Sequence, residues 1–307
     1  LWPLAAVMAL IAVPLLPLAA TSQTPKYGGV LVTAPLSAAP SLSPHEESTV
    51  AVVQQASPCF NNLVIFDQLK RTESLETIVG ELAEKWSWQD GYRNLVFFLR
   101  RDVKWHDGKP FTSRDVKFTF DMVREAPGAE GKLRLNPRKD WYANVDHIEA
   151  PDPYTVVFRL RRPQPSLLIM LASGYSPVYA AHIPPAQYRT TCVGTGPFKL
   201  KEWRHGEYID YVKNPDYFVK GRPYLDSLRY VIIENRGTRI SALQTGKLDV
   251  SFPGETTKTI AEQLKKAVPQ MVITTVGQSV SDNIIMNVKK PPFDNLYVRQ
   301  AVASVLD

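Results

Sequence analysis

The stretch Val193 to Trp203, VGTGPFKLKEW, separates two kinds of fold, because its paired glycines and nearby lysines could belong to a phosphate-binding loop. A P-loop needs a glycine, four residues and then Gly-Lys-Ser/Thr, and a dinucleotide-binding loop needs a third glycine where this chain has Lys199. Residues 198–203 instead alternate apolar and polar side chains, as a strand does. Pro197 also lacks the amide that a phosphate would require. The stretch therefore predicts a tight turn into a strand.

Strand and helix patterns alternate on both sides of this turn, which predicts a mixed α/β architecture with several sheets. A capping box from Thr112 to Asp115 begins one helix, whose apolar face carries Val116, Phe120 and Val123. Further helices are expected at 46–55, 165–171, 238–244 and 258–266, and strands at 28–34, 95–99, 155–160, 196–203, 207–213, 227–233, 248–252, 271–276 and 283–288.

The last segment has an apolar stripe that needs a covering partner. Asp294 is a suitable N-cap, and Val298, Ala301, Val302 and Val305 follow at helical spacing. We therefore expect an N-terminal fragment of a longer protein.

Composition argues against nucleic-acid binding. The chain has 307 residues, 44% of them hydrophobic, and a formal net charge of +6 that is spread along the sequence. Proteins that bind nucleic acid usually cluster lysine and arginine on one face or tail. The length and apolar content predict a substantial core, with more than one domain.

The first twenty residues, Leu1 to Ala20, carry no charge and end in small side chains. This pattern is typical of a signal peptide over residues 1–22, which predicts a location outside the cytoplasmic membrane. A membrane anchor is the alternative, since the run has about the ~20 residues that a span needs. Pro3, Pro14 and Pro17 disfavour a spanning helix.

Motifs for catalysis, metal binding and cofactors are absent from the sequence. No Gly-x-Ser-x-Gly and no His-Glu-x-x-His occurs, and the five histidines are widely separated. We therefore predict no catalytic residue, no metal ligand and no cofactor. His106 is interpreted as a hydrogen-bonded turn residue. Cys59 and Cys192 could form one disulfide or remain two buried thiols.

Several motifs resemble those of the family 5 extracellular solute-binding proteins, the dipeptide-, oligopeptide- and nickel-binding components of bacterial ABC importers. The most specific block is Val103-Lys-Trp-His-Asp-Gly-Lys-Pro-Phe-Thr112. Similar motifs lie, in order, at Tyr27–Val32, Ser41–His45, Asn62–Asp67, Leu82–Trp86, Gly194–Phe198, Asn214–Tyr217, Gly221–Asp226, Gly246–Asp249 and Val298–Ala301.

This resemblance implies a periplasmic-binding-protein-like fold of two lobes, with an extra subdomain in the first lobe. The first lobe is then expected at 27–60 and 191–270, the extra subdomain at 61–190, and the hinge strands with the start of a truncated second lobe at 271–307. The resemblance also implies a monomer that captures peptides, closes its two lobes on them and delivers them to membrane permease subunits.

Ligand-contacting residues are expected in loops beside the cleft between the lobes. For each, an ordinary role in a loop or hinge is the alternative. The candidates are Leu36, Ser37, Ala38, Asn61, Thr195, Phe252, Gly254, Gly277, Ser279 and Asn283.

Other functions stay open at this point. Another solute, such as a nickel chelate, haem, an opine or a sugar, would use the same scaffold, and His45 is the histidine considered for nickel. A secreted hydrolase and a peptide sensor for a signalling partner are alternatives of a different class.

Overall fold

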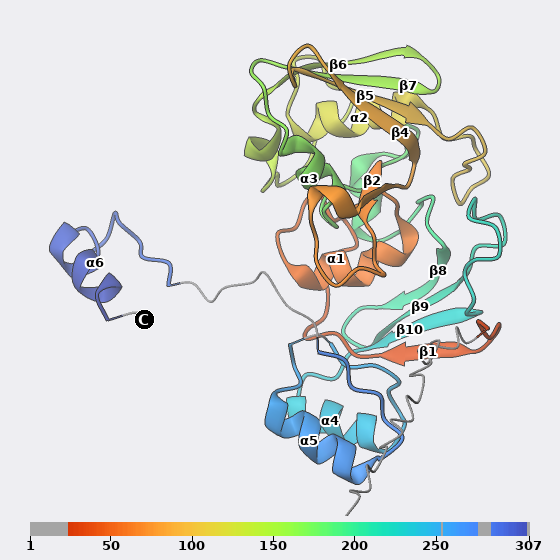
Figure 1. The fold of residues 1–307 in the computed structure, drawn as a ribbon, viewed down its shortest axis with the longest axis vertical. Coiled ribbons are helices and arrows are strands. Elements are labelled where there is room, and N and C mark those ends of the chain that lie inside the picture. Colours follow the sequence, from red (N-terminus) through yellow and green to blue (C-terminus); the bar gives the residue numbers. More distant parts are fainter. Residues whose placement is uncertain (1–23, 253, 276–283, 306–307) are drawn as a thin grey trace, which may run out of the picture.

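Three β-sheets organise the chain in the computed structural model, which describes residues 24–252, 254–275 and 284–305 (Figure 1). The segment expected to be a signal peptide, residues 1–22, lies outside the described residues. The mixed α/β prediction is confirmed, because helices are interleaved with the strands along the chain.

The sheet that carries the opening stretch has four strands in the order β1-β10-β9-β8. They span β1 (Val30–Thr33), β8 (Phe198–Arg204), β9 (Tyr208–Lys213) and β10 (Ser227–Val231). β1 is parallel to β10, and the other two pairings are antiparallel. The expected turn from Gly196 into a strand is confirmed by β8.

A second four-stranded sheet is antiparallel, in the order β4-β5-β7-β6, and α2 packs against β6 and β7. Its strands are β4 (Ala83–Gln89), β5 (Asn94–Leu99), β6 (Val145–Asp152) and β7 (Thr155–Leu160). A separate pair joins β2 (Val64–Phe66) to β3 (Ile78–Gly80).

Helix α2 (Ser113–Val123) begins at the predicted capping box. The Thr112 amide donates to Asp115 Oδ2 at 2.8 Å, and the carboxylate thereby satisfies a donor that the helix itself leaves free. Val116, Phe120 and Val123 are fully buried, as their spacing predicted.

Five further α-helices lie in the described chain: α1 (Val50–Ala56), α3 (Leu167–Ala172), α4 (Arg236–Gln244), α5 (Lys258–Ala267) and α6 (Leu296–Ala303). The 3₁₀ turn η1 (Ser57–Cys59) continues α1, and other 3₁₀ turns lie at η2 (Leu75–Thr77), η3 (Lys139–Tyr142) and η4 (Pro185–Arg189).

Several elements differ from the sequence prediction. α1 begins later than expected, because the buried Glu46 carboxylate binds Arg189 at 2.7 Å instead of opening a helix. Asn295, rather than Asp294, caps α6. The strand expected at 248–252 is reduced to one bridge between Val250 and Thr33. Residues 271–275 and 284–288 are not strands, since neither segment pairs with another described part of the chain.

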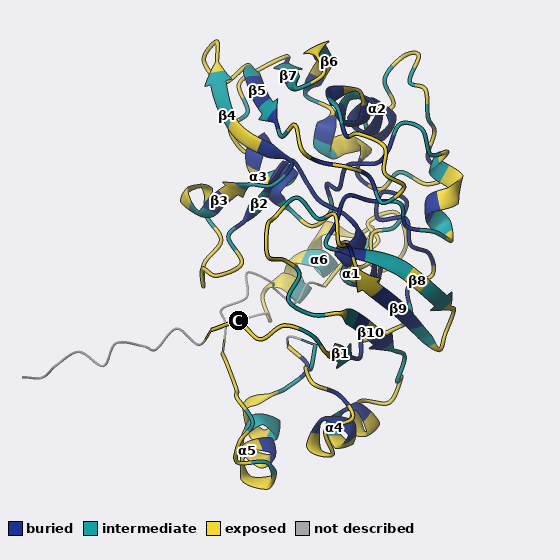
Figure 2. Cartoon of the chain, turned by 90° about the vertical axis from the view of Figure 1, so that its right-hand side faces the viewer, coloured by how far each residue is buried: buried dark blue, intermediate teal, exposed yellow. Residues whose placement is uncertain are grey.

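Most of the buried apolar side chains form one core that runs through the sheets, drawn in dark blue in Figure 2. Trp105 is fully buried in it, and four other tryptophans pack against it. A smaller cluster joins Ala242 and Leu243 of α4 to Ala34 and Leu248. The core positions the edge of the first sheet, where three loops emerge.

Candidate ligand-binding site

Three loops leave the first sheet at the same edge. β1 and β10 are parallel, with Thr33 beside Tyr230, and Val250 joins Thr33 through a parallel bridge. The Thr33 hydroxyl also donates to the Val250 carbonyl at 3.0 Å. The chain after each of these points, at 34–38, at 232–235 and from 251 onward to Gly254 (residue 253 is not described), therefore starts from the carboxyl end of a parallel segment. Ligands in open α/β sheets bind at such ends.

Five of the ten expected ligand-contacting residues lie in two of these loops. Leu36 is 47% exposed, and Ser37 and Gly254 are also exposed, whereas Ala38 and Phe252 are partly buried. Gly254 has a φ of +80°, a backbone conformation that other residues rarely adopt. The edge thus offers apolar side chains and open backbone, which suit contacts along an extended ligand.

One guanidinium ties two of the three loops together. Arg239 donates to Glu255 Oε1 at 2.6 Å and to the Glu234 carbonyl at 2.8 Å, and both members of the ion pair are buried. A buried ion pair with further hydrogen bonds is costly to break, because the remaining charge loses its partner. Sequence reasoning missed this pair, since an arginine and a glutamate sixteen residues apart carry no local signal.

Asn61 and Thr195 form a second group, inside the protein. The Thr195 hydroxyl donates to Asn61 Oδ1 at 3.0 Å, and Asn61 Nδ2 donates to Glu81 Oε1 at 2.6 Å. Thr195 is 1% exposed and Asn61 is 3% exposed. The structure thus brings these two candidates together inside the protein, where Asn61 bonds to both Thr195 and Glu81.

Glu81 accepts hydrogen bonds through both carboxyl oxygens, the second from the Asn62 amide at 2.6 Å. Burial raises the pKa of Glu81 to about 7, although the hydrogen bonds from Asn61 and Asn62 act in the opposite direction. No cationic side chain lies within ion-pair distance of this carboxyl in the described chain. Glu81 was not among the residues expected to matter.

The glycines of the opening stretch pack directly on the backbone at Cys59. A Cβ on Gly194 would lie 1.8 Å from the Cys59 carbonyl oxygen, and a Cβ on Gly196 would lie 2.4 Å from the Cys59 carbonyl carbon. The Gly196 amide donates to that oxygen at 2.7 Å. Glycine is required here because two backbones meet with no room for a side chain.

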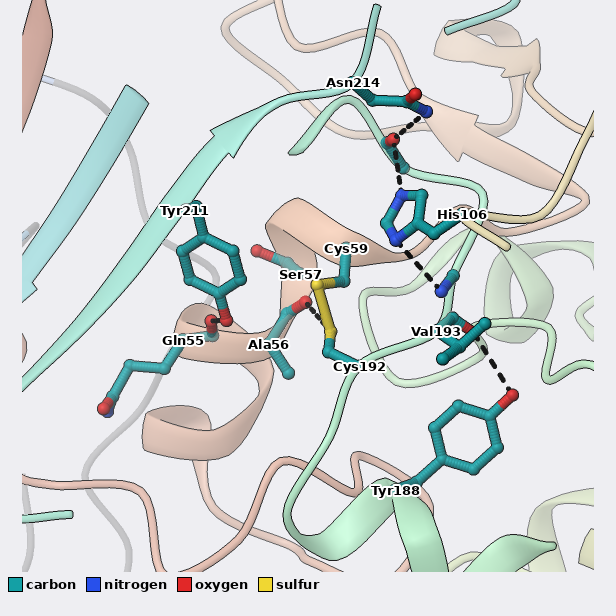
Figure 3. Close-up of a disulfide and its surroundings, with 12 residues drawn as sticks. Gln55, Ala56, Ser57, Cys59, His106, Tyr188, Cys192, Val193, Tyr211 and Asn214 are labelled. Atoms are coloured by element: carbon teal, nitrogen blue, oxygen red, sulfur yellow. Dashed lines mark hydrogen bonds between the residues drawn. A yellow bond between two sulfur atoms is a disulfide. The ribbon is translucent and has the colours of Figure 1, made fainter. Parts of the chain in front are cut away.

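His106 completes this contact from the turn between β5 and α2. Its Nε2 donates to the Gly196 carbonyl at 3.0 Å, and its Nδ1 accepts from the Gly194 amide at 3.3 Å (Figure 3). Burial lowers the pKa of His106, which favours the neutral ring that both hydrogen bonds need. The interpretation of His106 as a hydrogen-bonded turn residue is confirmed.

Cys59 and Cys192 form a disulfide, with Cα atoms 6.1 Å apart and a sequence separation of 133 residues. This settles the alternative that the sequence left open. The bond joins η1 to the segment before Gly194, so it holds the two backbones that the glycines bring together.

His45 is a core residue rather than a cleft residue, so the histidine considered for nickel was placed wrongly. It is fully buried, and its Nε2 donates to the Pro177 carbonyl at 2.7 Å. Burial lowers the pKa of His45 to about 3. Within the described residues, no group of three or more His, Cys, Asp or Glu side chains is placed to hold a metal ion.

Gly277, Ser279 and Asn283 lie outside the described residues. Within the ranges that are described, no helix combines the length and the apolar character needed to cross a membrane.

Comparison with known proteins gives a match over most of the chain. Residues 77–307 match the family model described as bacterial extracellular solute-binding proteins, family 5, middle region. A putative ABC transporter peptide-binding protein of Brucella ovis is 37% identical over 202 residues, which cover 63% of this chain and 36% of the relative.

Two solved structures show the same fold. The oligopeptide-binding protein AppA of Bacillus subtilis, solved with a nonapeptide, is 26% identical with a TM-score of 0.67 over 80% of this chain and 47% of that one. MoaA of A. tumefaciens R10, solved with mannopinic acid, is 26% identical with a TM-score of 0.74 over 92% of this chain and 56% of that one. The chain therefore spans about a third to a little over half of the length of these proteins.

Proposed function

Because this chain belongs to the bacterial extracellular solute-binding proteins of family 5, we propose that it is part of a binding protein that captures peptides outside the cytoplasmic membrane and delivers them to an ABC importer. The observation that carries the proposal is the shared sheet edge after β1 and Val250, where Leu36, Ser37 and Ala38 lie with Phe252 and Gly254. These residues form one wall of the ligand site.

Peptide is the ligand class that the relatives favour. The Brucella relative is described as peptide-binding, and AppA was solved with a nonapeptide. An extended peptide offers backbone donors and acceptors along its length, which match loops with open backbone groups. Membership of a solute-binding family supports binding rather than catalysis. Permease subunits are the partners, and the binding protein acts as a monomer.

The domain division is also part of the proposal. The disulfide between Cys59 and Cys192 closes the chain at both ends of the extra subdomain, 61–190, and the pairing of β1 with β10 unites the two parts of the first lobe, 27–60 and 191–270. Residues 271–307 are the hinge and the start of the second lobe. Closure occurs because a ligand that contacts both lobes binds the closed state better than the open one.

Export through an N-terminal signal at 1–22 fits the disulfide. Disulfides form and persist in the periplasm and outside the cell, and are rare in the reducing cytosol. The disulfide therefore supports a periplasmic location.

An opine-like solute is the second candidate, because MoaA with mannopinic acid aligns over 92% of this chain. Isothermal titration of the protein produced from its complete reading frame separates the two. We expect 1:1 heat with an equimolar pool of tri- to nonapeptides. Heat with mannopinic acid and none with the peptide pool would favour an opine-like ligand over peptide. No heat with either ligand would refute both.

Leu36→Ala tests the proposed wall. Losing an exposed leucine contact with bound peptide should cost about 1–2 kcal/mol, which is roughly a 5- to 30-fold weaker affinity. Leu69→Ala is the matched control, because Leu69 is 85% exposed and lies outside the three loops. Equal affinity of the Leu36 variant and wild type, by the same titration, would remove this loop from the ligand site.

A further inference from the structure

The side chain of Gln55 holds the loop that follows β1. Its Oε1 accepts from the Ala39 amide at 3.2 Å, and its Nε2 donates to the Ser37 carbonyl at 2.9 Å. The second hydrogen of the same Nε2 goes to the Ala51 carbonyl at 2.9 Å. Gln55 is fully buried, so water does not compete for these bonds. The side-chain amide of Gln55 therefore binds the loop through a donor and an acceptor at once.

The helix that carries Gln55 is itself fixed to the sheet. The Tyr211 hydroxyl from β9 donates to the Gln55 carbonyl at 2.6 Å, and the Tyr230 hydroxyl from β10 donates to the Gln54 carbonyl at 2.9 Å. Figure 3 shows the Gln55 side chain directed away from the disulfide, while its carbonyl meets Tyr211. Cys59 anchors the end of the same segment through the disulfide. The Gln55 side chain and its two bonds to Ser37 and Ala39, called the clamp below, are thus held on a fixed helix.

The loop has few other ties. In the part of the chain that the structure describes, the amides of Leu36, Ser37 and Ala38 make no hydrogen bond. Pro35 and Pro40 flank the loop and have no amide to donate. The two bonds from Gln55 therefore hold the loop in the conformation that the structure shows.

We propose that Gln55 is a positioning residue for ligand binding, which presets the loop from Leu36 to Ala39 without contacting the ligand. This inference rests on the proposed function, since the loop is one wall of the peptide site. A loop held in its bound conformation before the ligand arrives loses less conformational entropy on binding, and the affinity is higher for that reason. Releasing the clamp should weaken binding while every ligand contact remains in the sequence.

Two variants release the clamp in different ways. Gln55→Met keeps the volume and removes both loop bonds. Gln55→Glu keeps the shape and the acceptor for Ala39, but it places a carboxylate oxygen against the carbonyls of Ser37 and Ala51, which need a donor. Tyr142→Phe is the control for general destabilisation, because it removes a buried hydrogen bond to Ser176 elsewhere in the core.

Hydrogen–deuterium exchange in the ligand-free protein from the complete reading frame measures the clamp directly. We expect exchange of the Ala39 amide, which donates to Gln55 Oε1, to rise about tenfold or more in Gln55→Met and by less in Gln55→Glu, which keeps an acceptor, with no change in Tyr142→Phe. The peptide pool should bind each Gln55 variant at least about tenfold more weakly and the Tyr142 variant as wild type does.

Unchanged exchange of the Ala39 amide in a folded Gln55→Met variant would overturn the proposal, and so would raised exchange with wild-type peptide affinity. If wild type itself binds no peptide, the proposed function fails, and the exchange result still decides whether Gln55 fixes the loop. A Gln55→Glu chain that does not fold leaves Gln55→Met to give the answer.

Discussion

Replacing Gly194 with alanine is expected to prevent folding or to lower the free energy of unfolding by more than about 3 kcal/mol, beyond the usual cost of overpacking a core. The added Cβ would lie 1.8 Å from the Cys59 carbonyl oxygen, and that oxygen belongs to backbone rather than to a flexible side chain. The backbone has little freedom to retreat. Cys59 is bonded to Cys192, and its carbonyl accepts the Gly196 amide at 2.7 Å.

Thermal unfolding followed by circular dichroism measures this effect, with Gly174→Ala as the matched control. A Cβ on Gly174 would meet Val53 Cγ1 at 3.1 Å, and a side-chain methyl group can move by a few tenths of an ångström. We expect the control to stay within about 1 kcal/mol of wild type and Gly196→Ala to behave like Gly194→Ala. A Gly194 variant that melts with the control would show that the two backbones can separate at low cost.

The need for glycine in this stretch could be predicted from the sequence, but its contact could not. The pattern around Gly194 and Gly196 excludes a phosphate loop and predicts a tight turn into a strand, and both conclusions rest on neighbouring residues alone. The partner backbone at Cys59 lies about 135 residues earlier in the chain, and hydrophobic periodicity says nothing about contacts at that distance. The capping box before α2, by contrast, is a local device, and the structure reproduces it.

The candidate site, too, could be predicted from the sequence only in part. Leu36, Ser37 and Ala38 were chosen because strand ends place loops near ligands, and the structure sets them beside the chain after Val250. Asn61 and Thr195 were chosen by resemblance, and their contact with each other could not be foreseen. Gln55 was overlooked, because a glutamine at the end of a short helix is normally solvated, and only the return of the loop buries it.

His45, which is fully buried, and Glu81, which is partly buried, are expected to affect stability in opposite directions between pH 4.5 and 6.5. Burial lowers the pKa of His45 from 6.5 to about 3, so the unfolded chain binds a proton that the folded chain does not, and stability falls as the pH falls below 6.5. Burial raises the pKa of Glu81 from 4.5 to about 7, so the folded chain holds a proton that the unfolded chain releases, and stability falls as the pH rises above 4.5. Within this window the two proton counts cancel.

Replacing either residue should reveal the pH dependence of stability that the other one causes. In His45→Gln, which keeps a donor for the Pro177 carbonyl, stability relative to wild type should rise by about 1.4 kcal/mol for each pH unit of acidification from 6.5 to 4.5. In Glu81→Gln it should fall by about the same amount per unit, in addition to a constant loss because the new amide donor faces Asn61 or Asn62.

Urea denaturation of wild type, both single variants and the double variant at pH 4.5, 5.5 and 6.5 measures these slopes, because other titrating groups cancel in each difference from wild type. The free energy of unfolding of the double variant should follow the same pH dependence as that of wild type. If the free energy of unfolding of His45→Gln and of wild type changed with pH in the same way, His45 would take up its proton without unfolding of the core. If the difference from wild type changed with pH in the same direction for both single variants, the opposite pKa shifts of His45 and Glu81 would be refuted. The two effects cancel only if the unfolded chain binds the His45 proton and the folded chain binds the Glu81 proton.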